Sequence, residues 1–144
     1  MSIIVERNVA VPMGDGVVLR ADLYRPESRG AFPTLIQRTP YNKEFGPLTG
    51  ITLDPLRAAA RGYAILIQDV RARWASEGGV FFMYRHEFED GGDTVRWAAA
   101  QPWCNGQIGA YGLSYMGAAT WLMAASALLA LSTAAAGVPV MLSN

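Results

Sequence analysis

Six consecutive residues, Gly112-Leu113-Ser114-Tyr115-Met116-Gly117, place a serine between two glycines. An apolar run from Gln107 to Tyr111 precedes them, and a long stretch of small and apolar residues follows. This order predicts a strand, a sharp turn and a helix, with the hydroxyl of Ser114 exposed on the turn. Glycines suit such a turn, because a Cβ just before or after the serine would clash with the backbone. A serine hydroxyl in this position could act as a nucleophile.

The glycine spacing departs from the G-x-S-x-G pattern of nucleophile turns. Met116 stands where the second glycine is expected, and Gly117 comes one place later. Taken alone, the hexapeptide leaves a second interpretation open, in which Ser114 is only a small residue at a crowded turn. The strands and helices around Ser114 are therefore needed to decide between the two interpretations.

The rest of the chain reads as strands alternating with helices. Turn residues Met13-Gly14-Asp15-Gly16 predict a hairpin, and an Asp54-Pro55 pair predicts the start of a helix. The expected strands are Ile4 to Val11, Val17 to Tyr24, Thr34 to Gln37, Tyr63 to Asp69 and Ile108 to Tyr111, and the expected helices are Leu53 to Arg61, Glu89 to Ala100 and Tyr115 to about Leu131. Such alternation predicts an α/β fold with a mostly parallel sheet, an initial antiparallel hairpin and helices on both faces.

Composition narrows the function classes. The 144 residues suffice for one domain with a core. Twelve basic residues balance twelve acidic ones, which gives no reason to expect a nucleic-acid or anionic membrane partner. The single cysteine, Cys104, excludes a disulfide scaffold, and no metal or other cofactor is expected. The N-terminus does not resemble a secretory signal, so we expect a cytoplasmic protein.

One stretch raises an alternative. Met116 to Val140 carries no charge and is apolar enough to suggest a membrane-spanning helix. It also contains Gly137, Pro139 and several hydroxyl residues, and it has no basic flank. A buried helix followed by a buried parallel strand would give the same pattern, and we favour that interpretation.

Several further motifs occur in the order and rough spacing of a known family. They are Arg38-Thr39-Pro40-Tyr41-Asn42-Lys43, Gln68-Asp69-Val70-Arg71-Ala72-Arg73, Ala75-Ser76-Glu77-Gly78, Asp90-Gly91-Gly92-Asp93-Thr94, Ala100-Gln101-Pro102-Trp103-Cys104-Asn105-Gly106 and the hexapeptide around Ser114. With them the chain resembles the N-terminal part of the cocaine esterase and X-prolyl dipeptidyl-peptidase family of serine α/β-hydrolases. The family's own nucleophile turn is similar in reading G-x-S-Y-x-G.

The resemblance implies a role for three residues. Ser114 would be the nucleophile, forming an acyl-enzyme from an ester or amide. Tyr115 would donate its backbone N–H to the oxyanion, and Tyr41 would supply the second donor through its hydroxyl. Without the resemblance, Tyr41 reads equally well as an ordinary loop aromatic. The implied substrate is a small-molecule ester or amide, or a short peptide.

Other polar residues are assigned structural roles. Asp69, Arg71 and Arg73 predict a salt-bridged loop, in which Ala72 and Trp74 stand where the family usually has glycines. That departure puts the conformation of the loop in doubt. His86, the only histidine, precedes Ser114 in a polar run, whereas the acid and histidine of α/β-hydrolases follow the nucleophile. Asp90 and Asp93 likewise fit a helix N-terminus rather than a triad.

No Asp, Glu or His follows Ser114. We therefore expect residues 1–144 to be a single, incomplete α/β-hydrolase domain without the helical cap and the C-terminal β-sandwich of the family. Apolar surface along Met116 to Leu142 should then be exposed and could support self-association. Two hypotheses remain: a serine hydrolase (esterase, acylase or X-prolyl dipeptidyl-peptidase) in its complete form, or a catalytically inactive fragment or interaction module.

Overall fold

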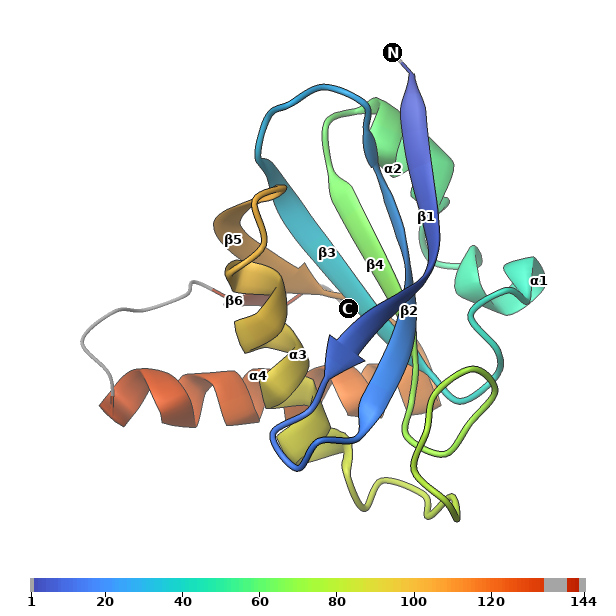
Figure 1. Cartoon of the computed structure of the whole chain (residues 1–144), viewed down its shortest axis with the longest axis vertical. Coiled ribbons are helices and arrows are strands. Elements are labelled where there is room, and N and C mark those ends of the chain that lie inside the picture. The colour runs from blue at the N-terminus through green and yellow to red at the C-terminus, as the bar shows by residue number, and fades with distance from the viewer. Residues whose placement is uncertain (1, 134–139, 143–144) are drawn as a thin grey trace.

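A computed structural model of the chain describes residues 2–133 and 140–142. It contains a six-stranded sheet with the order β1-β2-β4-β3-β5-β6 (Figure 1). The strands are β1 (Ile3–Pro12), β2 (Val18–Pro26), β3 (Phe32–Thr39), β4 (Ala64–Asp69), β5 (Cys104–Ala110) and β6 (Val140–Leu142). The helices are α1 (Gly46–Thr49), α2 (Pro55–Ala60), α3 (Glu87–Ala99) and α4 (Tyr115–Thr133). The predicted α/β fold is confirmed.

The sheet is antiparallel at its start and parallel beyond. β1 pairs with β2 and β2 pairs with β4 in antiparallel fashion, whereas β3 is parallel to both β4 and β5, and β6 is parallel to β5. The β1–β2 register shifts between Glu6 and Val9. Asn8 lies in this bulge with φ +54°, and its N–H donates to the carboxylate of Asp22 at 3.0 Å.

Each face of the sheet has its own core, because side chains alternate along a strand. In β4, Ala64 and Leu66 face the larger core, to which α3 and α4 contribute Val95 and Met123. Ile65 and Ile67 face the other way, toward Ala58 and Ala59 of α2 and Tyr24 of β2. All of β4 is buried as a result. Helices therefore cover both faces, as the alternation predicts.

The bounds of three elements can be compared with the sequence predictions. Asp54 is the N-cap of α2, as predicted, and its side chain accepts hydrogen bonds from the N–H groups of Leu56 and Arg57. Helix α1 has no counterpart among the sequence predictions. β5 begins at Cys104 rather than Ile108, because Phe32 pairs with Cys104 across an irregularity in the β3–β5 register. The Asn105-Gly106 pair, typical of turns, is accommodated within the strand by a positive φ at Gly106.

Helix α4 packs on α3 and β3 but leaves large apolar side chains at the surface. Trp121, Leu128 and Leu129 are each more than half exposed, in agreement with the apolar surface expected from the sequence. No helix among the described residues has the length and apolarity needed to cross a bilayer. The sequence predicts a buried parallel strand after the last helix, and β6 pairs with β5 in parallel fashion. Residues 134–139 lie outside the described part of the chain.

Candidate active site

Ser114 lies on the turn between the parallel strand β5 and helix α4, as the sequence predicts. The N–H of Tyr111 extends the strand pairing by donating to the carbonyl of Ile36 at 3.2 Å. Three residues later the backbone of Ser114 has φ +58°, a conformation that costs a residue with a side chain about 1–2 kcal/mol. Ser114 is exposed. A strained, exposed serine at the carboxyl edge of a parallel sheet is the geometry of a nucleophile elbow.

The glycines of the hexapeptide allow the turn to close. A Cβ on Gly112 would lie 2.6 Å from the Cβ of Met116 and 2.8 Å from its carbonyl oxygen. A Cβ on Gly117 would lie 3.2 Å from the carbonyl oxygen of Gly112. The first turn of α4 therefore packs directly on the backbone before the serine. Gly117, one place later than the pattern expects, therefore lies close to the backbone of Gly112.

Tyr41 and Tyr115 meet beside this turn. Tyr41 follows β3, the strand next to β5, and the residue is 37% exposed. Tyr115 is the first residue of α4 and is buried. Their ring centroids are 6.4 Å apart with the planes at 73°. Because the first N–H groups of a helix have no partner within it, the N–H of Tyr115 is available at the turn.

The loop after β4 anchors the segment that carries Tyr41. The carbonyl of Pro40 accepts hydrogen bonds from Nε1 of Trp74 at 3.0 Å and from Nε of Arg73 at 3.1 Å. Ala72 and Trp74 have φ values of +63° and +49°. Both thus adopt the left-handed conformation that glycine tolerates best. The loop thus has two left-handed residues that are not glycine, and the Trp74 side chain makes a hydrogen bond that glycine could not make.

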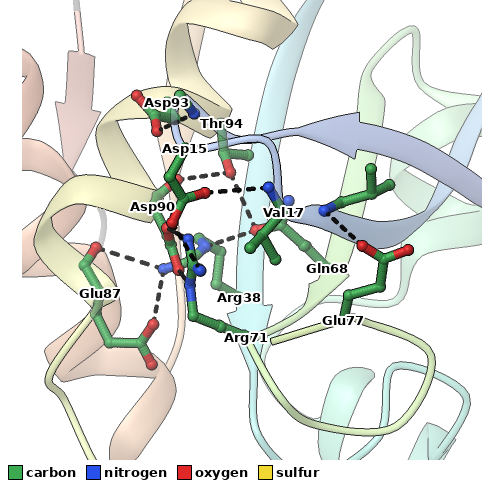
Figure 2. Close-up of polar contacts among 12 residues, drawn as sticks. Asp15, Val17, Arg38, Gln68, Arg71, Glu77, Glu87, Asp90, Asp93 and Thr94 are labelled. Carbon is green, nitrogen blue, oxygen red and sulfur yellow. Dashed lines mark hydrogen bonds and ion pairs between the residues drawn. The ribbon is translucent and has the colours of Figure 1, made fainter. Parts of the chain in front are cut away.

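The expected ion pairing of Asp69 is wrong. Its carboxylate accepts backbone N–H bonds from Lys43 at 2.7 Å and Ala75 at 3.2 Å. Burial raises its pKa above the ordinary value for an aspartate. Arg71 instead pairs with Asp90 of α3 and Asp15 of the hairpin turn at 2.8 and 2.9 Å (Figure 2). Arg71 does not pair with Asp69, its neighbour in the sequence, because the loop folds back onto α3 and brings Arg71 to Asp90.

Glu87 lies beneath Tyr115 and carried no signal in the sequence. The Tyr115 hydroxyl donates to its Oε2 at 2.5 Å. Its Oε1 accepts from Nη1 of Arg38 at 3.2 Å, and Nε of Arg38 donates to Gln68 at 2.6 Å. Burial, followed by the bond to Glu87, raises the pKa of Tyr115 above that of an ordinary tyrosine. The phenol therefore remains a hydrogen-bond donor at alkaline pH.

The remaining ionisable candidates lie at α3. His86 is half-buried at the N-cap of the helix and makes no side-chain capping bond. Asp90 is in the first turn, as expected, and forms a bidentate pair with Arg71. Asp93 accepts from the N–H of Gly14 at 2.8 Å. Both aspartates make structural contacts, but only Asp90 lies at the helix N-terminus as predicted. Asp93 lies beyond the first turn of α3, because the helix begins at Glu87.

A large cavity lies away from Ser114. A cavity of about 780 Å³ is lined by parts of β1, α1 and α2, with Arg7 and Lys43 on its wall and neither Ser114 nor Tyr41. Among the described residues, no group of three or more His, Cys, Asp or Glu side chains converges in a way that could hold a metal ion.

Comparison with known proteins identifies a family and a relative of this chain. The family model of X-Pro dipeptidyl-peptidase (S15 family) matches residues 15–142. The cocaine esterase of Rhodococcus sp. (strain MB1 Bresler) is 43% identical over 124 residues, which are 85% of this chain and 21% of that protein. The chain thus spans about a fifth of that relative's length.

Solved structures of similar proteins share the fold. A CocE/NonD family hydrolase from Staphylococcus aureus superposes with a TM-score of 0.76 at 28% identity, over 90% of this chain and 26% of that one. An aminopeptidase from a marine sediment archaeon of the Thaumarchaeota gives a TM-score of 0.68 at 27% identity, over 83% of this chain and 23% of that one. The glycine-flanked elbow, the sheet and these matches agree: the chain belongs to the X-Pro dipeptidyl-peptidase (S15) family of α/β-hydrolases.

Proposed function

We propose that Ser114 is the nucleophile of a serine hydrolase that acts on esters or amides. The observation that carries the proposal is the backbone of Ser114, which is exposed at φ +58° between β5 and α4. Such a strained conformation persists only where surrounding structure holds it, and it is often part of a mechanism. The substrates are small-molecule esters or amides, or short peptides, as the names of the family and of its relatives suggest.

The proposed reaction begins with attack of Ser114 Oγ on the substrate carbonyl carbon while a base removes the hydroxyl proton. The resulting oxyanion is stabilised by the N–H of Tyr115 and the hydroxyl of Tyr41. Collapse of the intermediate breaks the bond to the alcohol or amine, which leaves with a proton. Water then hydrolyses the acyl-serine. In a longer protein, the acid and the histidine would follow Ser114 in that order.

A second candidate function is a non-catalytic interaction module. The exposed Trp121 and Leu128 of α4 favour it. A fluorophosphonate probe separates the two candidates in a protein that carries the whole coding sequence. An activated serine is labelled and the Ser114→Ala variant is not, whereas an interaction module gives no Ser114-dependent labelling.

The 144-residue chain allows a test that needs no histidine. At pH 9 a larger fraction of a serine hydroxyl is ionised than at neutral pH, so transfer of an acetyl group from 4-nitrophenyl acetate to Ser114 can be followed without a histidine base. Intact-mass and peptide mass spectrometry follow the acetylation of Ser114 over time. We expect Ser114 to be acetylated faster than Ser2 and Ser28, which are serines of the same chain outside the site. Equal rates at the three serines would refute the proposed nucleophile.

A further inference from the structure

We propose that Glu87 is a positioning residue that holds Tyr115, and through it the oxyanion donors, in place beside Ser114. The inference rests on the proposed function and concerns a residue that does not itself touch the reacting atoms. Tyr115 is the residue directly after the nucleophile, so its side chain and its N–H share one Cα. Fixing the phenol at one end restricts the direction of the N–H at the other.

The contacts of Tyr115 leave its side chain little freedom. Its hydroxyl donates to Oε2 of Glu87 and accepts the backbone N–H of Tyr84 at 3.0 Å. The ring of Tyr84 stacks on it with the centroids 4.5 Å apart, and the ring of Tyr41 meets it edge-on. The phenol is therefore held at its polar tip and on its ring. Because the ring of Tyr41 packs against this phenol, a shift of Tyr115 should also move Tyr41, the other proposed donor.

Glu87 is itself held from the opposite side. Arg38 of β3 donates from Nη1 to Oε1 and to the backbone carbonyl of Glu87, as Figure 2 shows. Nε of Arg38 donates to Gln68 of β4, whose Oε1 also accepts from Thr94 of α3. All these side chains are almost completely buried. The network thus joins the carboxyl ends of two central strands to α3 and to the first residue of α4.

The chemistry of the network calls for a carboxylate at position 87. Its two oxygens accept from two different donors, Oε2 from Tyr115 and Oε1 from Arg38. A carboxamide has one acceptor oxygen and one donor nitrogen, so Glu87→Gln can satisfy only one of the two donors. The Tyr115→Phe variant removes only the hydroxyl and keeps the ring with its stacking. Both substitutions break the same link from different ends.

The experiment measures acetylation of Ser114 by 4-nitrophenyl acetate at pH 9 in the unmodified chain and in four variants. Glu87→Gln, Tyr115→Phe and the double variant test the link. Glu89→Gln is the matched control, because it removes the same charge from the same helical turn at an exposed position. Far-UV circular dichroism and urea unfolding verify that each variant is folded. Rates are compared for folded protein only.

We expect Glu87→Gln and Tyr115→Phe each to slow acetylation about tenfold, since a 1 Å misplacement of a group can cost up to about a hundredfold. The double variant should be no slower than the slower single variant, because one link is lost in each case. Glu89→Gln should react at the unmodified rate. Folded Tyr115→Phe that reacts at the unmodified rate overturns the positioning role while leaving Ser114 as the nucleophile. Absence of selective acetylation in the unmodified chain overturns the proposed function, and the positioning role with it.

Discussion

The rings of Tyr41 and Tyr115 form a T-shaped pair, with the centroids 6.4 Å apart. The two residues follow neighbouring parallel strands, β3 and β5, and reach the same end of the sheet. Aromatic pairs in this arrangement add about 0.5–1.5 kcal/mol beyond the area they bury. The contact therefore orders a half-exposed tyrosine against a buried one.

Tyr41→Phe should keep this ring contact and remove the proposed oxyanion donor. Loss of one such donor costs about 10²–10³ in rate in enzymes with a complete site. We expect the acetylation of Ser114 at pH 9 to fall at least about tenfold, with unchanged stability toward urea. Tyr63→Phe is the matched control, because Tyr63 has nearly the same exposure, 38%, and lies before β4 at the other end of the strand. Equal rates for Tyr41→Phe and Tyr63→Phe would remove Tyr41 from the mechanism.

At neutral pH the chain itself should turn over esters no faster than its Ser114→Ala variant. A serine hydroxyl is a poor nucleophile unless a positioned base takes its proton, and His86 lies at the N-cap of α3. The measurement is turnover of 4-nitrophenyl acetate and butyrate by the chain, by Ser114→Ala and by His86→Ala. Activity that disappears in both variants would show that His86 serves as the base.

Ala72→Gly should stabilise the protein. Ala72 has φ +63°, which costs about 1–2 kcal/mol for a residue with a Cβ, while the greater freedom of glycine in the unfolded chain offsets about 0.4–1 kcal/mol of the gain. We expect the free energy of unfolding in urea to rise by up to about 1 kcal/mol. Ala75→Gly, in the same loop but without a positive φ, should lower it. A loss of stability in both variants would contradict the loop conformation described for residues 70–78.

Asp15→Asn should destabilise the protein in a pH-dependent way. The ion pair with Arg71 and the N–H of Val17 lower the pKa of Asp15 in the folded state. A carboxyl whose pKa is lower when folded contributes stability above its unfolded pKa, near 4, and loses it as the pH falls through the folded value. The urea midpoint of the variant should therefore lie below that of the unmodified chain at pH 6.

The same comparison at pH 2.5 provides the control for Asp15. The stability from its lowered pKa is lost as the pH falls below the unfolded pKa, so the difference between the two midpoints should be smaller there than at pH 6. A difference that is equally large at both pH values would mean that packing rather than charge accounts for the effect of the substitution.

Local signals in the sequence predicted most of the elements, whereas long-range contacts decided the details of the site. Asp54 and Pro55 mark the start of α2 because capping is a contact between near neighbours. The turn at Ser114 was likewise predictable from its flanking glycines. The role of Glu87 was not predictable, because it depends on hydrogen bonds from Tyr115 and Arg38, which are distant in the sequence. The structural role of Asp69 was predicted correctly, but its partners, the N–H groups of Lys43 and Ala75, were not.

The bulge in β1 bears on how the sheet could associate with other proteins. β1 is an edge strand, and an edge strand offers unpaired backbone groups to any strand that can align with it. The register shift between Glu6 and Val9 interrupts that alignment in the middle of the strand. The exposed guanidinium of Arg7 adds a charge at the same point. This side of the sheet is therefore protected against the runaway strand addition that leads to aggregates.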